Sequence, residues 1–478
     1  MSKSIPNTTA QEAASTIDDR RRLYAEGLRA EIPAGWDVLN IGDLCTIRTG
    51  KLDVNQADEG GKYPFFTCAE RIYQINTYAF DAEAILVAGN GFFNVKYYKG
   101  KFNAYQRTYV LSDIKTFGKY LYYYVDNRLR DITGESRGST ISYIRLGDLR
   151  DYPVAVAPPD QQNHIVAEIE KQFSRLDEAV ANLKRVKANL KRYKAALLKA
   201  AVEGKLTEQW RKEHPDVEPA RKLLERILAE RRAKWCGKGK YKEPSTHDMA
   251  NLPRLPDGWV WASIEQVVDN TLIGLDRGRV QQTESPQGGV PYIKMNNVTM
   301  DGRVSYYDLA YVPASEEERS RFAFRDGDLL FNTRNSKELV GKVGLVRNPP
   351  AGSIYNNNLM RIRVSEGMVS AFVCAQMCSA GFRGRMELVK KATTNVAAMY
   401  SKDLLPLAIA LPPTVEQHEI VAEIERRLSI IDELETLVEV NLARADRLKQ
   451  AILRKAFSGK LLGNDTLGKP QDRKLLNV

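Results

Sequence analysis

Two stretches of this chain combine basic, amide and aromatic side chains, the residue types that bind nucleic acid. Lys and Arg neutralise phosphates, and Arg and Asn can pair with base edges through two hydrogen bonds. In the first stretch the basic residues alternate with aromatic ones such as Phe92 and Tyr105. The candidate DNA-contacting residues are Arg48, Lys51, Lys96, Lys101, Arg107, Lys294, Asn296, Asn297, Arg303, Arg334, Asn335, Lys337 and Asn357. The alternative is solvated surface, with the Asn runs forming turns.

Composition and charge agree with an anionic partner. The chain has 478 residues, of which 71 are Lys or Arg and 60 are Asp or Glu, so the net charge is +11. Nucleic acid is the commonest partner of a chain with this charge, although an inert basic surface is the alternative. Hydrophobic residues make up 43%, which excludes a wholly disordered chain.

Residues that could catalyse a reaction are scarce. The chain has no phosphate-binding loop of the GxxxxGK[ST] type, which argues against ATP-driven work. Asn348-Pro349-Pro350-Ala351 resembles the Asn-Pro-Pro-aromatic motif of adenine methyltransferases, but Ala351 offers no ring to stack on a flipped base. Asp81 with Asp113 and Lys115 loosely fits a nuclease pattern, which surface charge explains better. We therefore expect no catalytic residue in this chain.

The cysteines indicate neither a disulfide framework nor a metal site. The five cysteines are scattered and form no CxxC pair. Cys374 and Cys378 have helical i,i+4 spacing and are expected to be buried thiols. The first 31 residues lack the apolar core of a signal peptide, and no run approaches the length of a membrane span. We expect a cytoplasmic protein with no membrane contact.

An internal repeat organises the chain. The sequence IVAEIE at residues 165–170 recurs at residues 420–425, a shift of 255 positions. LLKAAVEGKL at 197–206 corresponds to ILRKAFSGKL at 452–461 with the same shift. A Pro pair precedes each copy and a Gly closes it, which are the usual signals of a helix start and a helix end.

Between these signals, apolar residues recur every three or four positions, as in a coiled-coil seam. The residues expected to pack helix against helix are Ile165, Ile169, Leu176, Leu183, Leu190, Leu197, Ile420, Ile424, Ile431, Val438, Leu448 and Ile452. Neither stripe can be buried alone. The pattern therefore predicts two long helices packed antiparallel on each other, each about 65–70 Å long at 1.5 Å per residue.

The segments before the helices also correspond, because Pro33-Ala34-Gly35-Trp36 and Pro256-Asp257-Gly258-Trp259 open them alike. Both then mix short β-branched runs with turns, which favours an α/β (α+β) fold. The predicted plan is a pseudo-two-fold repeat: extension 1–30, domain 31–158, helix 159–206, basic connector with a short helix 207–253, domain 254–412, helix 413–462 and tail 463–478.

With the duplicated Pro-Pro…Gln…IVAEIE start, the Gly-Lys-Leu end and the Pro-x-Gly-Trp openings, the chain resembles the specificity subunit of type I restriction-modification enzymes. The resemblance covers about residues 33–462. It implies two target-recognition domains, each reading one half of a split sequence in double-stranded DNA. It also implies that the long helices bind two modification subunits, which carry S-adenosylmethionine and methylate adenine at N6.

A restriction subunit would supply translocation and cleavage with ATP and Mg²⁺, so this chain itself is expected to bind no cofactor. The second repeat lacks the Thr207-Glu208-Gln209-Trp210 sequence that follows the first Gly-Lys-Leu, and the two ends are therefore expected to engage partners unequally. Two alternatives remain from the residues alone. One is a self-contained methyltransferase or nuclease with degenerate motifs, and the other is a coiled-coil scaffold.

Overall fold

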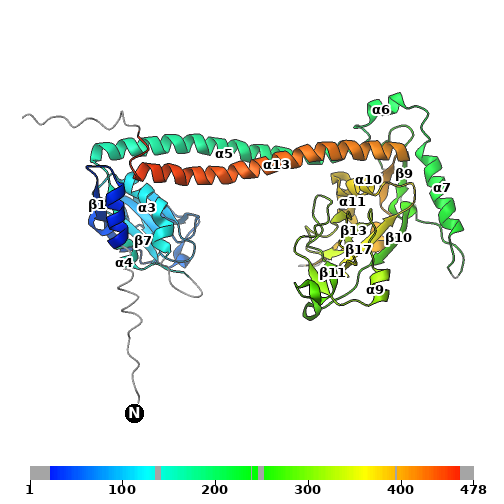
Figure 1. The fold of residues 1–478 in the computed structure, drawn as a ribbon, viewed down its shortest axis with the longest axis horizontal. Coiled ribbons are helices and arrows are strands. Elements are labelled where there is room, and N and C mark those ends of the chain that lie inside the picture. The colour runs from blue at the N-terminus through cyan, green and yellow to red at the C-terminus, as the bar shows by residue number, and fades with distance from the viewer. Residues whose placement is uncertain (1–21, 135–141, 238, 246–251, 393–395, 463–478) are drawn as a thin grey trace, which may run out of the picture. The chain divides into compact units, whose positions relative to one another are not determined.

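The computed structural model describes residues 22–134, 142–237, 239–245, 252–392 and 396–462. The predicted tail 463–478 and the first 21 residues of the predicted extension lie outside the described residues. The chain divides into two compact units, residues 1–184 with 439–478 and residues 185–438. Each unit holds one mixed domain, the start of one long helix and the end of the other (Figure 1).

The domain of unit 1 is built around a six-stranded sheet. The strands of the whole domain are β1 (Asp37–Asn40), β2 (Thr46–Thr49), β3 (Tyr63–Phe66), β4 (Tyr73–Ile75), β5 (Phe80–Ala88), β6 (Val95–Ala104), β7 (Thr108–Ser112) and β8 (Pro153–Val156). Its helices are α2 (Ile41–Leu44), α3 (Gly118–Thr133) and α4 (Leu146–Arg150). The sheet order is β2-β7-β5-β6-β3-β4, and β1 pairs with β8 apart from it.

Residues 22–31 are helical and pack on this domain. Leu28 is buried in the main core of the unit, and the ring of Tyr24 lies 5.7 Å from that of Tyr152. This part of the predicted extension therefore belongs to the folded unit.

The domain of unit 2 divides its strands among smaller sheets. The strands are β9 (Val260–Ser263), β10 (Val268–Ile273), β11 (Val290–Ile293), β12 (Ala310–Val312), β13 (Leu329–Asn332), β14 (Arg334–Asn335), β15 (Val343–Leu345), β16 (Ile354–Tyr355), β17 (Leu359–Val364), β18 (Lys391–Ala392), β19 (Ala397–Ala398) and β20 (Ala408–Leu411). The helices are α8 (Ile264–Val267), α9 (Glu316–Arg321), α10 (Ser370–Cys378), α11 (Ala380–Val389) and α12 (Ser401–Leu404).

The two domains share several pairings. The sheet orders in unit 2 are β10-β17-β13-β15, β12-β11-β16, β14-β19-β18 and β20-β9. In each domain an early strand pairs with the strand that leads into a long helix, β1 with β8 and β9 with β20. Each domain also has one parallel pair, β3 with β6 and β11 with β16. The prediction of two α/β domains built on one plan is confirmed.

The two long helices are α5 (Pro159–Val202) and α13 (Thr414–Phe457), and the connector contains α6 (Glu208–Glu213) and α7 (Ala220–Ala233). Both long helices end on a Gly in the left-handed region, Gly204 at φ 69° and Gly459 at φ 71°. A Cβ on Gly204 would lie 2.7 Å from Cγ of Pro256, and one on Gly459 would lie 2.1 Å from Cγ of Pro33. Each helix therefore ends against the Pro-x-Gly-Trp opening of a domain, α5 in unit 2 and α13 in unit 1.

Repeat-equivalent ion pairs set the register of the helices within each unit. In unit 1 the ammonium of Lys449 lies 2.6 Å from Asp177, and in unit 2 that of Lys194 lies 2.8 Å from Asp432. The repeat shift of 255 converts Asp177 into Asp432 and Lys194 into Lys449. From Asp177 to the later Lys194 on α5, the partner on α13 changes from Lys449 to the earlier Asp432. The two helices therefore pair antiparallel in both units.

The predicted packing residues are buried to different degrees. Ile165, Ile169, Leu197, Ile420, Ile424, Ile431 and Val438 are buried, and Leu176, Leu183, Leu190 and Ile452 are half-buried. Leu448 is 41% exposed, while Ala445 and Leu453 are buried on the same helix. Because a helix has 3.6 residues per turn, positions counted every three or four residues do not all stay on one face. In this part of α13 the buried face contains Ala445 and not Leu448.

The methyltransferase-like and nuclease-like segments have ordinary structural roles. Asn348 adopts φ 47° in a bend, and Ala351 lies in the turn that the amide of Ser353 closes by donating to the carbonyl of Pro350 at 3.1 Å, in agreement with the interpretation of this segment as a turn. Asp113 pairs with Arg48 at 3.1 Å, and Lys115 donates to the carbonyl of Asp43 at 2.7 Å. The described residues contain no group of three His, Cys, Asp or Glu side chains that could hold a metal ion. Nor does the described chain have a helix long and apolar enough to cross a membrane.

Candidate nucleic-acid interface

Four loops meet in the domain of unit 1, although they are far apart in the sequence. The amide of Gly89 donates to the carbonyl of Arg107 at 2.9 Å, and the thiol of Cys68 reaches the same carbonyl at 3.4 Å. Asn94 donates to the carbonyl of Cys68 at 2.9 Å, and Gly91 donates to that of Ser142 at 3.0 Å. These contacts define the first loop cluster, residues 67–71, 89–94, 105–107 and 142–144.

The first loop cluster displays some predicted residues and uses another internally. Arg107 is exposed on it, and the exposed Lys51 precedes Leu52, which forms a bridge with Tyr105. Lys96 instead donates to the carbonyl of Ala69 at 2.8 Å, and burial lowers the pKa of its ammonium group. Lys96 therefore shapes the loops, whereas Arg107 and Lys51 can reach a ligand.

Arg48 and Lys101 lie on strands rather than in the first loop cluster. Arg48 is an exposed residue of β2 that pairs with Asp113. Lys101 is an exposed residue of β6, and its ammonium lies 4.7 Å from the ring centre of Tyr78, which raises the pKa of Lys101. Neither cation therefore belongs to the first loop cluster, although β2 pairs with β7, the strand that follows Arg107.

A second loop cluster forms in unit 2 from residues 294–297, 332–337, 356–358 and 399–400. Thr333 donates to the carbonyl of Asn358 at 2.9 Å, and Met399 donates to the carbonyl of Thr333 at 2.9 Å. The buried ammonium of Lys342 donates to the carbonyl of Met295 at 2.7 Å, and burial lowers its pKa. Each cluster therefore receives a hydrogen bond from a lysine outside it, which donates to a main-chain carbonyl of the cluster.

Asn side chains hold the second loop cluster together. The amide of Asn332 donates to the carbonyls of Arg334 and Asn358 at 3.1 Å each, and Asn335 donates to Asn332 at 2.8 Å. The buried Asn297 accepts from the amide of Lys294 at 2.9 Å. Asn297 and Asn335 thus stabilise loops. Arg334, Lys337 and Asn296 are exposed, and Lys294 and Asn357 are half-buried.

Arg303 lies at the junction of the domain with α13 and not in the second loop cluster. Its guanidinium pairs with Asp301 and reaches Asp432 of α13 at 3.1 Å. Hydrogen bonding to Asp301 raises the pKa of Arg303. Because both carboxylates bind this side chain, Arg303 links the domain of unit 2 to α13.

Sequence reasoning missed the residues that fasten each domain to the start of a long helix. The amide of Phe117 donates to Gln162 at 2.9 Å, and Gln162 donates to the carbonyl of Ala157 at 2.7 Å. The amide of Val369 donates to Gln417 at 2.8 Å, and Gln417 donates to the carbonyl of Pro412 at 3.0 Å. Both Gln side chains are buried. The repeat aligns them, and that alignment was the available signal.

Comparisons with known proteins show the family of this chain. A model of the type I restriction modification DNA specificity domain matches residues 33–192. The specificity subunit of the type I restriction enzyme EcoDI from Escherichia coli is 31% identical over 436 residues, which are 90% of each chain. This chain belongs to the type I restriction enzyme specificity subunits. The specificity subunit of EcoKI, from Escherichia coli strain K12, is 27% identical over 333 residues, covering 69% of this chain and 62% of that one.

A solved chain of a type I restriction-modification system shows the same fold, with a TM-score of 0.57 and 18% identity over 90% of this chain and 99% of that one. The predicted family is confirmed. Membership also confirms that this chain is the specificity component and not itself the enzyme.

Proposed function

We propose that this specificity subunit reads a bipartite sequence in double-stranded DNA, one half with each loop cluster. The observation that carries the proposal is duplication: each unit fastens a domain to a helix start through a buried Gln and displays basic side chains from loops. The first loop cluster offers Arg107, with Lys51 next to it in the chain segment that bridges to Tyr105, and the second offers Arg334, Lys337 and Asn296. Such groups neutralise phosphates and bind base edges.

The loops suit sequence reading because their main chains are fixed from within. Asn332, Asn335 and Lys342 hold the second loop cluster through hydrogen bonds to main chain and to each other. A loop held in this way keeps its exposed side chains near one geometry, which lowers the entropy lost on binding. Two readers on one chain also make the second contact intramolecular, so two short half-sites bind as one longer site.

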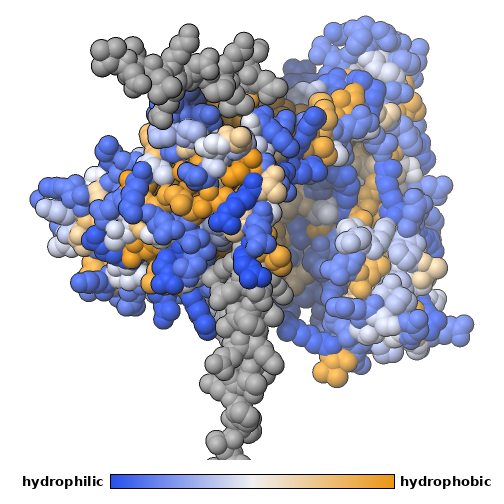
Figure 2. All heavy atoms as spheres, turned by 60° about the vertical axis from the view of Figure 1, so that its left-hand side comes forward, coloured by the Kyte–Doolittle hydropathy of each residue, from blue (hydrophilic) through white to orange (hydrophobic). Residues whose placement is uncertain are grey.

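The long helices offer a surface for the modification subunits. Ile430, Leu434 and Leu437 are between 42% and 57% exposed and lie on one face of α13, at spacings of four and three residues. Figure 2 shows that apolar side chains also appear among charged ones elsewhere at the surface. An exposed apolar stripe on a helix favours contact with a partner helix. We propose that two modification subunits and a restriction subunit assemble on this chain in the cytoplasm, and that S-adenosylmethionine, ATP and Mg²⁺ bind those partners.

The first experiment selects bound sequences from a random DNA pool with the wild-type chain and with R107A and R334A. Each substitution is expected to relax one half of the split sequence and to leave the other half intact, by about ten-fold in base preference for a lost bidentate contact. R221A is the matched control, because it removes an equal charge from the exposed surface of α7. Two unaltered half-sites in both loop variants would contradict the assignment of the loop clusters.

The second experiment tests the role of the helices. One heptad is inserted after Leu190, with a matching heptad in α13 that keeps the pair in register. The accepted gap between the half-sites is expected to change while their sequences stay the same. Altered half-sites with an unchanged gap would refute the proposal. Affinity that stays flat as salt rises would instead indicate a scaffold, since phosphate neutralisation requires a steep fall.

A further inference from the structure

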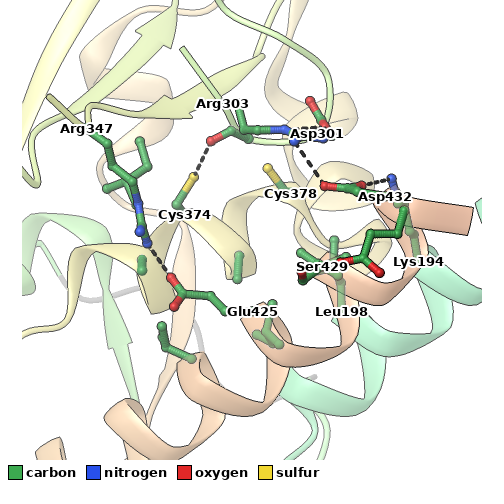
Figure 3. Close-up of a pocket in the computed structure, with 18 of the residues that line it drawn as sticks. Lys194, Leu198, Asp301, Arg303, Arg347, Cys374, Cys378, Glu425, Ser429 and Asp432 are labelled. Carbon is green, nitrogen blue, oxygen red and sulfur yellow. Dashed lines mark hydrogen bonds and ion pairs between the residues drawn. The ribbon is translucent and has the colours of Figure 1, made fainter. Parts of the chain in front are cut away.

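Unit 2 contains a cavity of about 620 Å³ between its domain, α13 and the end of α5 (Figure 3). Apolar side chains line most of it, including Leu198, Leu345 and Leu428. Two buried thiols, Cys374 and Cys378, also face it from α10, four residues apart as the sequence predicted. The volume is within the range of sites that accept a ligand.

Ion pairs surround this apolar lining. Arg347 pairs with Glu425, and Asp432 binds both Arg303, at 3.1 Å, and Lys194, at 2.8 Å. Figure 3 shows these pairs at the edge of the cavity, with the two thiols on the domain side. Because the cations in the lining already have carboxylate partners, the site favours a neutral group over an anion.

Unit 1 has an equivalent place, and the Gln contacts show how its residues align. Gln162 binds the amide of Phe117 and Gln417 binds that of Val369, so the first turns of α3 and α10 can be aligned from these two residues. Counting five and six residues onward, Tyr122 corresponds to Cys374 and Tyr123 to Ala375. By the repeat shift of 255, Phe173 of unit 1 corresponds to Leu428 of unit 2, and Asp177 corresponds to Asp432.

In unit 1 the corresponding positions carry aromatic rings that pack on each other. The rings of Tyr122 and Tyr123 are 4.9 Å apart, and Tyr123 meets Phe173 edge-on at 5.8 Å. The ammonium of Lys449 lies 5.5 Å from the ring centre of Phe173. Unit 2 has a thiol, a methyl group and a Leu at the three ring positions. The smaller side chains leave the space that rings occupy in unit 1.

We infer that the cavity of unit 2 receives an aromatic side chain from a modification subunit. This inference rests on the proposed function. In unit 1 the equivalent space between the domain and the two long helices accommodates phenyl and phenol rings. The paired charges at the rim match a neutral ring. The partner occupies unit 2 through this ring, whereas unit 1 carries its own rings, so the two halves bind their partners with different affinities.

The test fills the cavity with the side chains that unit 1 carries. A375Y/L428F is compared with A375S, which changes the same position without adding a ring. Native mass spectrometry and calorimetry with the purified modification subunit measure how many copies bind and how tightly. We expect the wild type and A375S to bind two copies, and A375Y/L428F to bind one copy unchanged and the other at least ten-fold more weakly. Two copies bound to the filled variant with wild-type affinities would overturn the inference and leave the proposed function intact.

A second measurement needs no substitution in the cavity. A small thiol reagent, methyl methanethiosulfonate, is applied to the wild-type chain with and without the modification subunit. The labelling rates of Cys374 and Cys378 are expected to fall at least ten-fold in the complex, while the exposed Cys236 serves as the internal reference. Unchanged rates in a two-copy complex would also overturn the inference. A dimer of the isolated chain that A375Y/L428F abolishes would assign the cavity to a second copy, and failure of the wild type to bind any modification subunit would remove both proposals.

Discussion

At the start of each long helix a Trp indole donates a hydrogen bond to a side chain of the helix, but the acceptor is neutral in one case and charged in the other. At α5 the indole of Trp36 donates to the neutral Gln161 at 2.9 Å, and at α13 the indole of Trp259 donates to Glu416 at 2.8 Å. Gln161 and Glu416 are equivalent under the repeat shift of 255, and Trp36 and Trp259 each belong to the Pro-x-Gly-Trp opening of a domain. Glu416 is buried, so its acid group needs partners that Gln161 does not.

The connector supplies those partners. Thr207 donates to Glu416 at 2.7 Å, and Arg211 pairs with the same carboxylate while donating to the carbonyl of Gly204 at 2.7 Å. Thr207 belongs to the sequence that follows the first Gly-Lys-Leu and is missing after the second. The connector is therefore part of the core of unit 2. The two repeats differ at the position where unit 2 has the charged Glu416 and unit 1 has the neutral Gln161.

The largest expected effect comes from removing the cation. R211M leaves Glu416 buried with hydrogen bonds but no counter-charge, and should lower the free energy of unfolding of unit 2 by roughly 3 kcal/mol. Adding E416Q recreates the neutral arrangement of unit 1 and should restore most of that loss. Urea denaturation of the wild type, both single variants and the double variant gives the coupling between the two sites. Additive losses in the double variant would mean that the charge does not distinguish the two helix starts.

The second prediction concerns what the two starts share. Q162L and Q417L each remove one acceptor and one donor from a buried contact, and each should cost about 2 kcal/mol. Hydrogen exchange should accelerate at the amide of Phe117 in the first variant and at that of Val369 in the second. A loss confined to one variant would show that the two Gln side chains are not equivalent in energy.

The smallest effect involves Glu168 and Glu423, which the repeat also aligns. Hydrogen bonds from Arg426 and Arg427 lower the pKa of Glu423 to about 2, and those from Gln172 and Lys171 lower that of Glu168. Because the folded pKa lies below the unfolded one, each contribution is complete above the unfolded value and is lost as pH falls through the folded value.

E423Q should therefore cost about 0.5 kcal/mol near neutral pH. The difference from wild type should start to shrink only below the ordinary pKa of 4.5. E168Q should follow the same direction. Urea denaturation from pH 7 to pH 3 provides the measurement, and a difference that grows on acidification would reverse the assigned sign.

The sequence alone determined the duplicated plan, the helix starts and ends, and the family. The helix starts and ends depend on local signals, since Pro pairs, a closing Gly and apolar periodicity act within one or two turns, and the plan and the family follow from the repeat of these signals 255 positions later. The aligned ion pairs, Asp177 with Lys449 and Lys194 with Asp432, also follow from the repeat once the helices are antiparallel.

The tertiary structure was needed to tell which basic residues are displayed on loops and which hold the protein together. Arg303 and Arg107 are both exposed, yet one pairs with a carboxylate of α13 and the other lies on a loop of the first loop cluster. Arg211 meets Glu416 across 205 positions. The cavity of unit 2 depends on the sizes of side chains from three helices. Such contacts join residues distant in the chain, and folding brings them together through packing that no local pattern records.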